Sequence, residues 1–160
     1  PPPTMSPQDL DTLALLLERA SADRDRLAAE LRRAEEVQRH QQAQADHLAA
    51  YREEYVQRWS RQFGRGGAIE IVQCYQSFMQ RLEEAMLQQA AQVERASSVL
   101  NQLRDALQQA EMRVASVRKL IDRRLQERAR AEQRREQKQS DEAAQHSAHR
   151  RGTHGLAFHH

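Results

Sequence analysis

The sequence has few of the residues that build turns and compact cores. Its 160 residues include 5 Gly, 4 Pro and 1 Cys, and aromatic residues make up only 4 %. A compact α/β enzyme needs more glycine for its turns and more large apolar residues for its core, so the composition argues against that class. The single cysteine, Cys74, cannot form an intrachain disulfide, and we interpret it as an exposed, inert thiol in a reducing compartment.

Long apolar runs and a strong excess of one charge are also missing. No stretch approaches the roughly 20 apolar residues that cross a bilayer, and we see no signal peptide. Charged residues make up 30 % of the chain but leave a net charge of only +2. The sequence therefore predicts a cytoplasmic protein with no membrane insertion and no nucleic-acid partner.

What the chain does have is a heptad repeat between residues 68 and 148. Read in sevens from Val72, two columns are almost entirely apolar, which predicts a helix supercoiled against a partner helix. The first column holds Val72, Met79, Met86, Val93, Leu100, Leu107, Val114 and Ile121. The second holds Tyr75, Leu82, Gln89, Ala96, Leu103, Ala110 and Val117.

An earlier helix is predicted over residues 6–63, after a disordered lead at 1–5. Ser6 is its expected cap, and Pro7 suits the first helical position. Its stripe weakens at Gln38 and Gln41, and Arg24 and Arg52 interrupt it; we expect these arginines to extend to water. The stripe comprises Leu10, Leu13, Leu17, Ala20, Leu27, Leu31, Ala34, Ala45, Leu48, Tyr55 and Trp59.

The glycines at residues 64–67 are the break between the two helices. A P-loop needs Lys and then Ser or Thr after its last Gly, whereas Ala68 and Ile69 follow here, so we predict a reversal in which Gly67 ends the turn. Folding at about residue 65 places Leu10 opposite about Ile121, so the two stripes have matching lengths. The prediction is an all-α, antiparallel coiled-coil hairpin about 80 Å long.

The second helix is expected to overhang its partner over residues 122–148, with a disordered tail at 149–160. The overhang is rich in basic residues, interspersed with acidic ones. Two interpretations remain open: a solvated, frayed helix, or a helix that docks on the acidic surface of another protein. Its arginines are Arg123, Arg124, Arg128, Arg130, Arg134 and Arg135.

The region after the turn holds more apolar residues than a two-stranded seam requires. Phe78, Leu82, Ala85 and Gln89 form a line that edges off the seam. This line predicts either packing near the turn or a partner-binding patch. Catalytic, cofactor and metal sites are not indicated; the histidine pairs His40/His47 and His146/His149 (one heptad and three residues apart) lack further ligands.

Three segments in this order, at these distances from the turn, resemble the flagellar export protein family FliJ. The resemblance covers about residues 6–148. The segments are Tyr51-Arg52-Glu53-Glu54-Tyr55, Tyr75-Gln76-Ser77-Phe78-Met79-Gln80-Arg81-Leu82-Glu83-Glu84-Ala85 and Gln137-Lys138-Gln139-Ser140-Asp141-Glu142-Ala143-Ala144.

The resemblance implies a non-catalytic part of the flagellar type III export apparatus, similar to the stalk of rotary ATPases. It implies binding to the hexameric export ATPase, the cytoplasmic domain of the export gate and export chaperones, with the ATPase regulator subunit as a further partner. The protein would be a monomer in isolation and peripheral at the cytoplasmic face of the inner membrane. The family's gate-binding stripe corresponds to Phe78, Leu82 and Ala85, followed by Gln89 where the family often has His. The alternative from the residues alone is a structural coiled-coil adaptor or tether unrelated to flagella.

Overall fold

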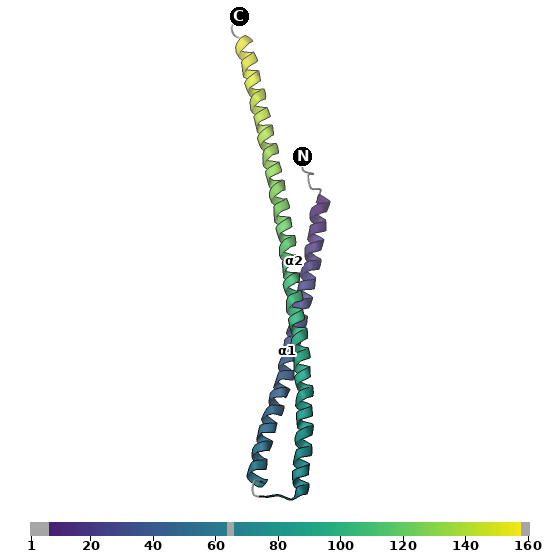
Figure 1. The fold of residues 1–160 in the computed structure, drawn as a ribbon. Coiled ribbons are helices and arrows are strands. Elements are labelled where there is room, and N and C mark those ends of the chain that lie inside the picture. The colour runs from purple at the N-terminus through teal and green to yellow at the C-terminus, as the bar shows by residue number, and fades with distance from the viewer. Residues whose placement is uncertain (1–6, 64–65, 158–160) are drawn as a thin grey trace. The chain divides into compact units, whose positions relative to one another are not determined.

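The protein is a pair of long helices. The computed structural model describes residues 7–63 and 66–157, and contains α1 (Pro7–Phe63, 57 residues) and α2 (Ile69–Ala157, 89 residues), joined by a short connection (Figure 1). No strand occurs within these described ranges. The predicted all-α helical hairpin is therefore confirmed.

Helix α1 begins at Pro7, whose fixed φ suits a first helical position. Asp9 lies in its first turn and Arg61 in its last, each placed favourably for the helix dipole. No glycine or further proline interrupts the 57 residues. The lead at 1–5 and the cap expected at Ser6 lie outside the described residues.

Helix α2 begins after Ala68, whose carbonyl accepts hydrogen bonds from the amides of Ile71 (3.0 Å) and Val72 (3.2 Å). The turn bends at Gly66, where φ is 98°, a conformation that a side chain would disfavour. We expected Gly67 to end the turn, but the left-handed residue is its neighbour. Gly64 and Arg65, also assigned to the turn, lie outside the described residues.

The end of α2 differs from the sequence-based prediction. We expected the helix to stop at residue 148 before a disordered tail, but it continues through Gly152 to Ala157. A single glycine costs a helix about 1 kcal/mol and does not by itself break it. The Thr153 hydroxyl also donates to the carbonyls of His149 and Arg150 in the preceding turn. Residues 158–160 lie outside the described part.

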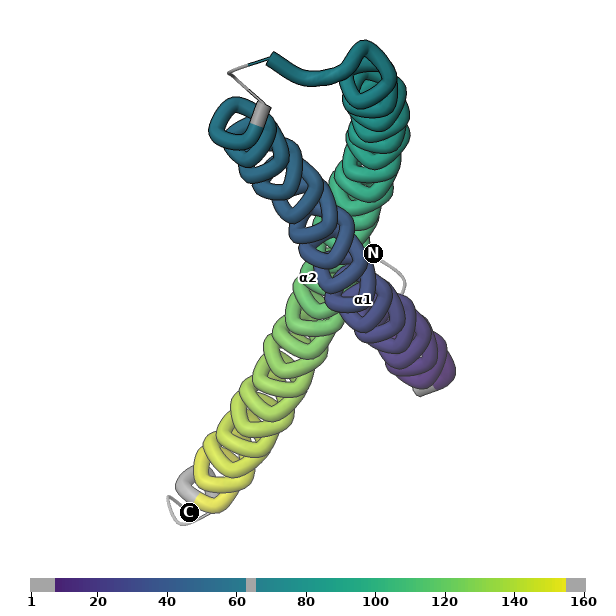
Figure 2. The backbone as a smooth tube through the Cα atoms, turned by 90° about the horizontal axis from the view of Figure 1, so that it is seen from below, coloured from purple at the N-terminus to yellow at the C-terminus, as the bar shows by residue number. Residues whose placement is uncertain are grey.

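The structure divides into two compact units. The turn unit comprises residues 21–112, and the terminal unit comprises 1–20 and 113–160. In the turn unit, the sequence separation of cross-helix partners falls toward the turn: 48 for Gln41 and Gln89, then 31 for Arg52 and Glu83. This decrease defines an antiparallel pair. The two helices of this unit cross at an angle (Figure 2), as supercoiled helices do.

The seam of the turn unit follows the predicted columns. Met79, Leu82 and Leu100 are at most 9 % exposed, and Ala110 is 2 % exposed. The other column residues of this unit are half-buried, including Gln38 and Gln41 at the weak point of the α1 stripe. Arg24 turns sideways to Asp25 (3.1 Å), and Arg52 reaches across to Glu83 (3.4 Å). The heptad pattern therefore identifies the core.

In the terminal unit, the seam continues on both helices and then stops. Val114 is 2 % exposed, while Leu10, Leu13 and Leu17 of α1 are half-buried. Between residues 125 and 154 every side chain of α2 is exposed except Ala131, which is half-buried. This part of α2 is a helix without a packed face.

Candidate partner-binding surfaces

Five aromatic residues gather on the turn unit near its turn. The rings of Tyr55 and Tyr75 stack at 5.6 Å, and those of Trp59 and Tyr75 at 4.1 Å. Phe78 packs between the helices against Tyr55 (4.4 Å) and edge-on to Tyr51 (6.2 Å). Such pairs add about 0.5–1.5 kcal/mol each beyond their buried area, so the cluster ties the two helices together beside the turn.

The line of Phe78, Leu82, Ala85 and Gln89 does not form one exposed patch. Leu82 is 7 % exposed and belongs to the core, while the other three are half-buried. The side-chain amide of Gln89 donates to the carbonyl and to Oε1 of Gln41, both at 2.8 Å. Only the outer edges of Phe78 and Ala85 remain for a partner in this arrangement.

The more exposed apolar side chains of this region include two that belong to the apolar surplus noted in the sequence after the turn, Ile69 and Leu87, together with Tyr51 of α1. Ile69 is 76 % exposed, Leu87 72 %, and Tyr51 48 %. The heptad columns could not reveal them because they lie outside both columns. These side chains expose a large apolar area beside the aromatic cluster, as partner-binding surfaces do.

The six arginines of the predicted overhang lie along the unpacked part of α2. Arg124 is half-buried, and Arg123, Arg128, Arg130, Arg134 and Arg135 are exposed. Within residues 7–63 and 66–157, none of them forms an ion pair; Arg134 donates instead to the carbonyl of Arg130 at 3.4 Å. The charges of the exposed arginines are left facing solvent.

Three of these six arginines occupy positions where the seam would continue, with Ala131 in the same register. Heptad spacing from Val114 and Val117 leads through Ile121 to Arg124, Arg128 and Arg135. An apolar column thus becomes a basic one where α1 no longer covers α2. A partner on this face would meet guanidinium groups, which bind carboxylates in a bidentate manner.

The cysteine and histidine side chains of the described residues do not gather into a metal site. Cys74 is a free, exposed thiol. His40 forms a hydrogen bond with the side-chain amide of Gln44, at 3.2 Å. The described residues contain no group of three or more His, Cys, Asp or Glu placed to hold a metal ion. Within the same ranges, neither helix is apolar enough over sufficient length to cross a membrane.

A comparison with known protein families matches residues 9–153 to the family described as flagellar FliJ protein. The chain belongs to the FliJ family. No curated protein and no solved structure matches it.

The FliJ match covers most of both helices. It reaches residue 153, beyond the end at 148 that the resemblance suggested, and so includes part of the segment expected to be a disordered tail. Membership implies a component of the flagellar export apparatus from a family of non-catalytic helical proteins. The six arginines of the overhang and the whole aromatic cluster lie within the matched region.

Proposed function

We propose that this chain is the stalk-like component of the flagellar export apparatus. It binds the hexameric export ATPase, promotes its assembly and activity, and couples it to the cytoplasmic domain of the export gate. It also escorts export chaperones and works beside the ATPase regulator subunit, at the cytoplasmic face of the inner membrane. The chain itself hydrolyses nothing; it binds some conformations of the ATPase subunits better than others and thereby biases their cycle.

The observation that carries this proposal is the change of the α2 seam from apolar to basic. Arg124, Arg128 and Arg135 stand in seam register; Arg124 is half-buried at the end of the paired region, and Arg128 and Arg135 are exposed beyond it. A helix of this length without packing is marginal alone, so binding to an acidic surface would stabilise it. Because these three arginines lie on the same face of α2, the ATPase surface that binds them would present carboxylates along a groove.

The gate contact is proposed at the aromatic cluster. Phe78 and Ala85 present their outer edges to the gate, whereas Leu82 supports the contact from within the core. Gln89 is engaged with Gln41, so its role is to hold the two helices in register. Substitution of Leu82 would then act mainly through stability, whereas substitution of Phe78 would affect binding as well as its packing against Tyr51 and Tyr55.

The decisive experiment titrates the export ATPase with the full chain while ATP turnover is recorded. The test variant reverses the charges of Arg124, Arg128 and Arg135 to Glu, and the control reverses Arg104, Arg113 and Arg118, which are exposed on the paired part of α2. We expect stimulation by the control but not by the test variant. A copy ending at Ile121 should also fail to stimulate.

Two outcomes would overturn parts of the proposal. Stimulation by the test variant and the shortened copy would move the ATPase contact to the paired helices. No stimulation by the wild-type chain, with an active ATPase, would favour the adaptor or tether interpretation.

The gate contact is tested by Phe78→Ala, with Ile69→Ala as the control for an exposed residue beside the turn. We expect Phe78→Ala to weaken binding to the purified gate domain while helicity is nearly unchanged. Equal affinity of the variant and the wild-type chain would contradict this placement.

A further inference from the structure

On one flank of the turn unit, the residues that α2 contributes are mostly apolar although a two-helix seam does not require it. In heptad notation, with Val72 at position a, position g of α2 lies beside the seam and faces position g of α1 in an antiparallel pair. The contact between Tyr51 and Phe78, both at g, shows this pairing directly. The g residues of α2 in this unit are Ile71, Phe78, Ala85, Gln92, Val99 and Ala106.

This flank opens into a groove midway along the turn unit, away from the aromatic cluster. Val37 of α1 and Val99 of α2 line it and are 53 % and 50 % exposed. Ala34 and Ala96 occupy the seam positions between them. Small residues at these positions leave a hollow of about 270 Å³ instead of a filled surface.

Polar groups border the groove at one end. Gln41, Gln92 and Arg95 complete its lining. The side chain of Gln41 is already held by Gln89 in the seam. The groove is therefore an apolar trough, and its fixed polar end would set the position of any helix lying in it.

The rim of the groove carries positive charge. Position c lies next to g on the helix surface, and it holds Arg33 in α1 and Arg95 in α2 at this level. Both are exposed, and neither forms an ion pair within the described part of the chain.

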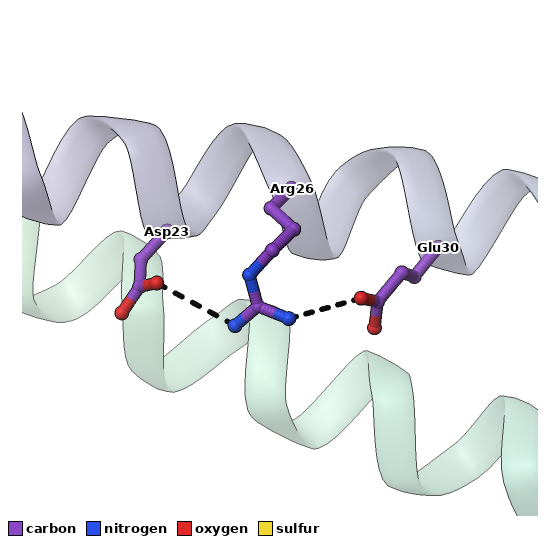
Figure 3. Close-up of polar contacts among 3 residues, drawn as sticks. All are labelled: Asp23, Arg26 and Glu30. Carbon is purple, nitrogen blue, oxygen red and sulfur yellow. Dashed lines mark hydrogen bonds and ion pairs between the residues drawn. The ribbon is translucent and has the colours of Figure 1, made fainter.

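A contrasting arrangement one heptad before Arg33 indicates why its charge is available. Arg26, also at position c, is held by Glu30 at 2.9 Å and Asp23 at 3.5 Å (Figure 3). The hydrogen bond to Glu30 is the main reason that the pKa of Arg26 is raised above its usual value. Both carboxylates stand at position g. Arg95 has only Gln92 and Val99 at the neighbouring g positions. Arg33 has Val37 one turn later, while Glu30, three residues before it, is already paired with Arg26. Both charges are therefore left for another molecule.

We propose that this groove binds an amphipathic helix of a partner protein that carries acidic residues on both sides of its apolar face. The trough between two helices matches the way an amphipathic helix docks in a groove. Apolar side chains of the partner fill the hollow between Val37 and Val99, and its carboxylates pair with Arg33 and Arg95. The surface is distinct from the six arginines of the overhang and from Phe78, so this inference goes beyond the proposed function.

The probe for this site is a synthetic helical peptide about three heptads long, with leucine and alanine on one face and glutamate on both flanks. A second peptide replaces the flanking glutamates by lysine. Binding of each labelled peptide to the full chain is measured by fluorescence anisotropy at low and high salt. We expect the acidic peptide to bind about tenfold or more tightly than the basic one, with a preference that falls as salt rises.

Matched variants separate the groove from the rest of the surface. Val99→Gln and Arg95→Glu should each weaken binding of the acidic peptide by about tenfold. Leu87→Gln, at a 72 % exposed apolar site outside the groove, and Arg26→Gln, at an arginine already paired, should change it by less than about twofold. All four sites are at the surface, and circular dichroism should show the same helix content in each.

Three results would overturn the inference. These are equal affinity for the two peptides, no binding of the acidic peptide to the wild-type chain, and equal loss of binding in Val99→Gln and Leu87→Gln. The last measurement is the molecular mass of the free protein in solution, which gives its oligomeric state. A dimer that Val99→Gln converts to a monomer would identify a second copy of this chain as the occupant and would also refute the acidic partner.

Discussion

Replacement of Leu100 by alanine tests whether the cross-helix seam holds this protein together. Leu100 is 7 % exposed, in the middle of the turn unit. Truncation of a buried leucine to alanine costs about 2–5 kcal/mol. The seam is narrow and open on both flanks, so water or neighbouring side chains can relax into the space. Alanine is also a slightly better helix former. Both effects place the expected loss near the lower limit, about 2 kcal/mol.

Leu87 provides a matched control, because it is in the same helix and the same unit but is 72 % exposed. The same substitution there should change the free energy of unfolding by less than about 0.5 kcal/mol. Trp59 is the single tryptophan and lies in the same unit, so its fluorescence follows the unfolding of this part of the chain. The urea midpoint should fall by about 1 M for Leu100→Ala and hardly move for Leu87→Ala.

The same titrations test whether both helices of the seam belong to one molecule. If α1 and α2 of one chain form the seam, the urea midpoint is independent of protein concentration, whereas a seam between chains becomes more stable as concentration rises. Equal shifts for Leu100→Ala and Leu87→Ala, or a midpoint that follows concentration, would refute the assignment of the core.

Four further tests address individual features. Gln89→Ala removes two hydrogen bonds to α1 and should cost about 1 kcal/mol, measured by urea unfolding; no change would show that the polar layer contributes nothing. The exposed pair Arg52–Glu83 should contribute less than about 1 kcal/mol in a double-mutant cycle and should weaken in high salt. Gly66→Ala should destabilise the turn by about 1 kcal/mol because φ is 98° there. Gly152→Ala should instead slow hydrogen exchange in the last turns of α2, since alanine favours a helix by about 1 kcal/mol, and faster exchange would contradict the helical end.

The seam was predictable from the sequence because a repeat of seven leaves little freedom in which residues face the partner helix. Val72, Leu100 and Val114 belong to one column, and none of them is exposed in the structure. The reversal was also predictable, since only the glycine-rich segment interrupts the two helical patterns. The cross-helix bond of Gln89 to Gln41 agrees with a fold at about residue 65.

What lies beside the seam could not be predicted in the same way. The burial of a flanking residue depends on how far one helix is rotated and shifted against the other, and a column pattern holds no information on either. Phe78 is covered by Tyr51 and Tyr55, whereas Val99 stays half exposed, although both stand at position g. The end of α2 was missed for a different reason: a disordered tail was predicted from residue 149, whereas the helix continues and Gly152 within it costs little.

Where the described parts of α1 and α2 are paired, the seam faces inward, so a partner of the paired helices must be recognised on their flanks. The core is one residue layer thick, and seam residues such as Leu82 and Leu100 serve stability first. A substitution there changes binding only by loosening the surface that lies above it. A flank substitution such as Val99→Gln changes the surface and leaves the seam intact. Loss of function must therefore be compared with the free energy of unfolding for each variant, because only variants that lose binding at unchanged stability locate a partner.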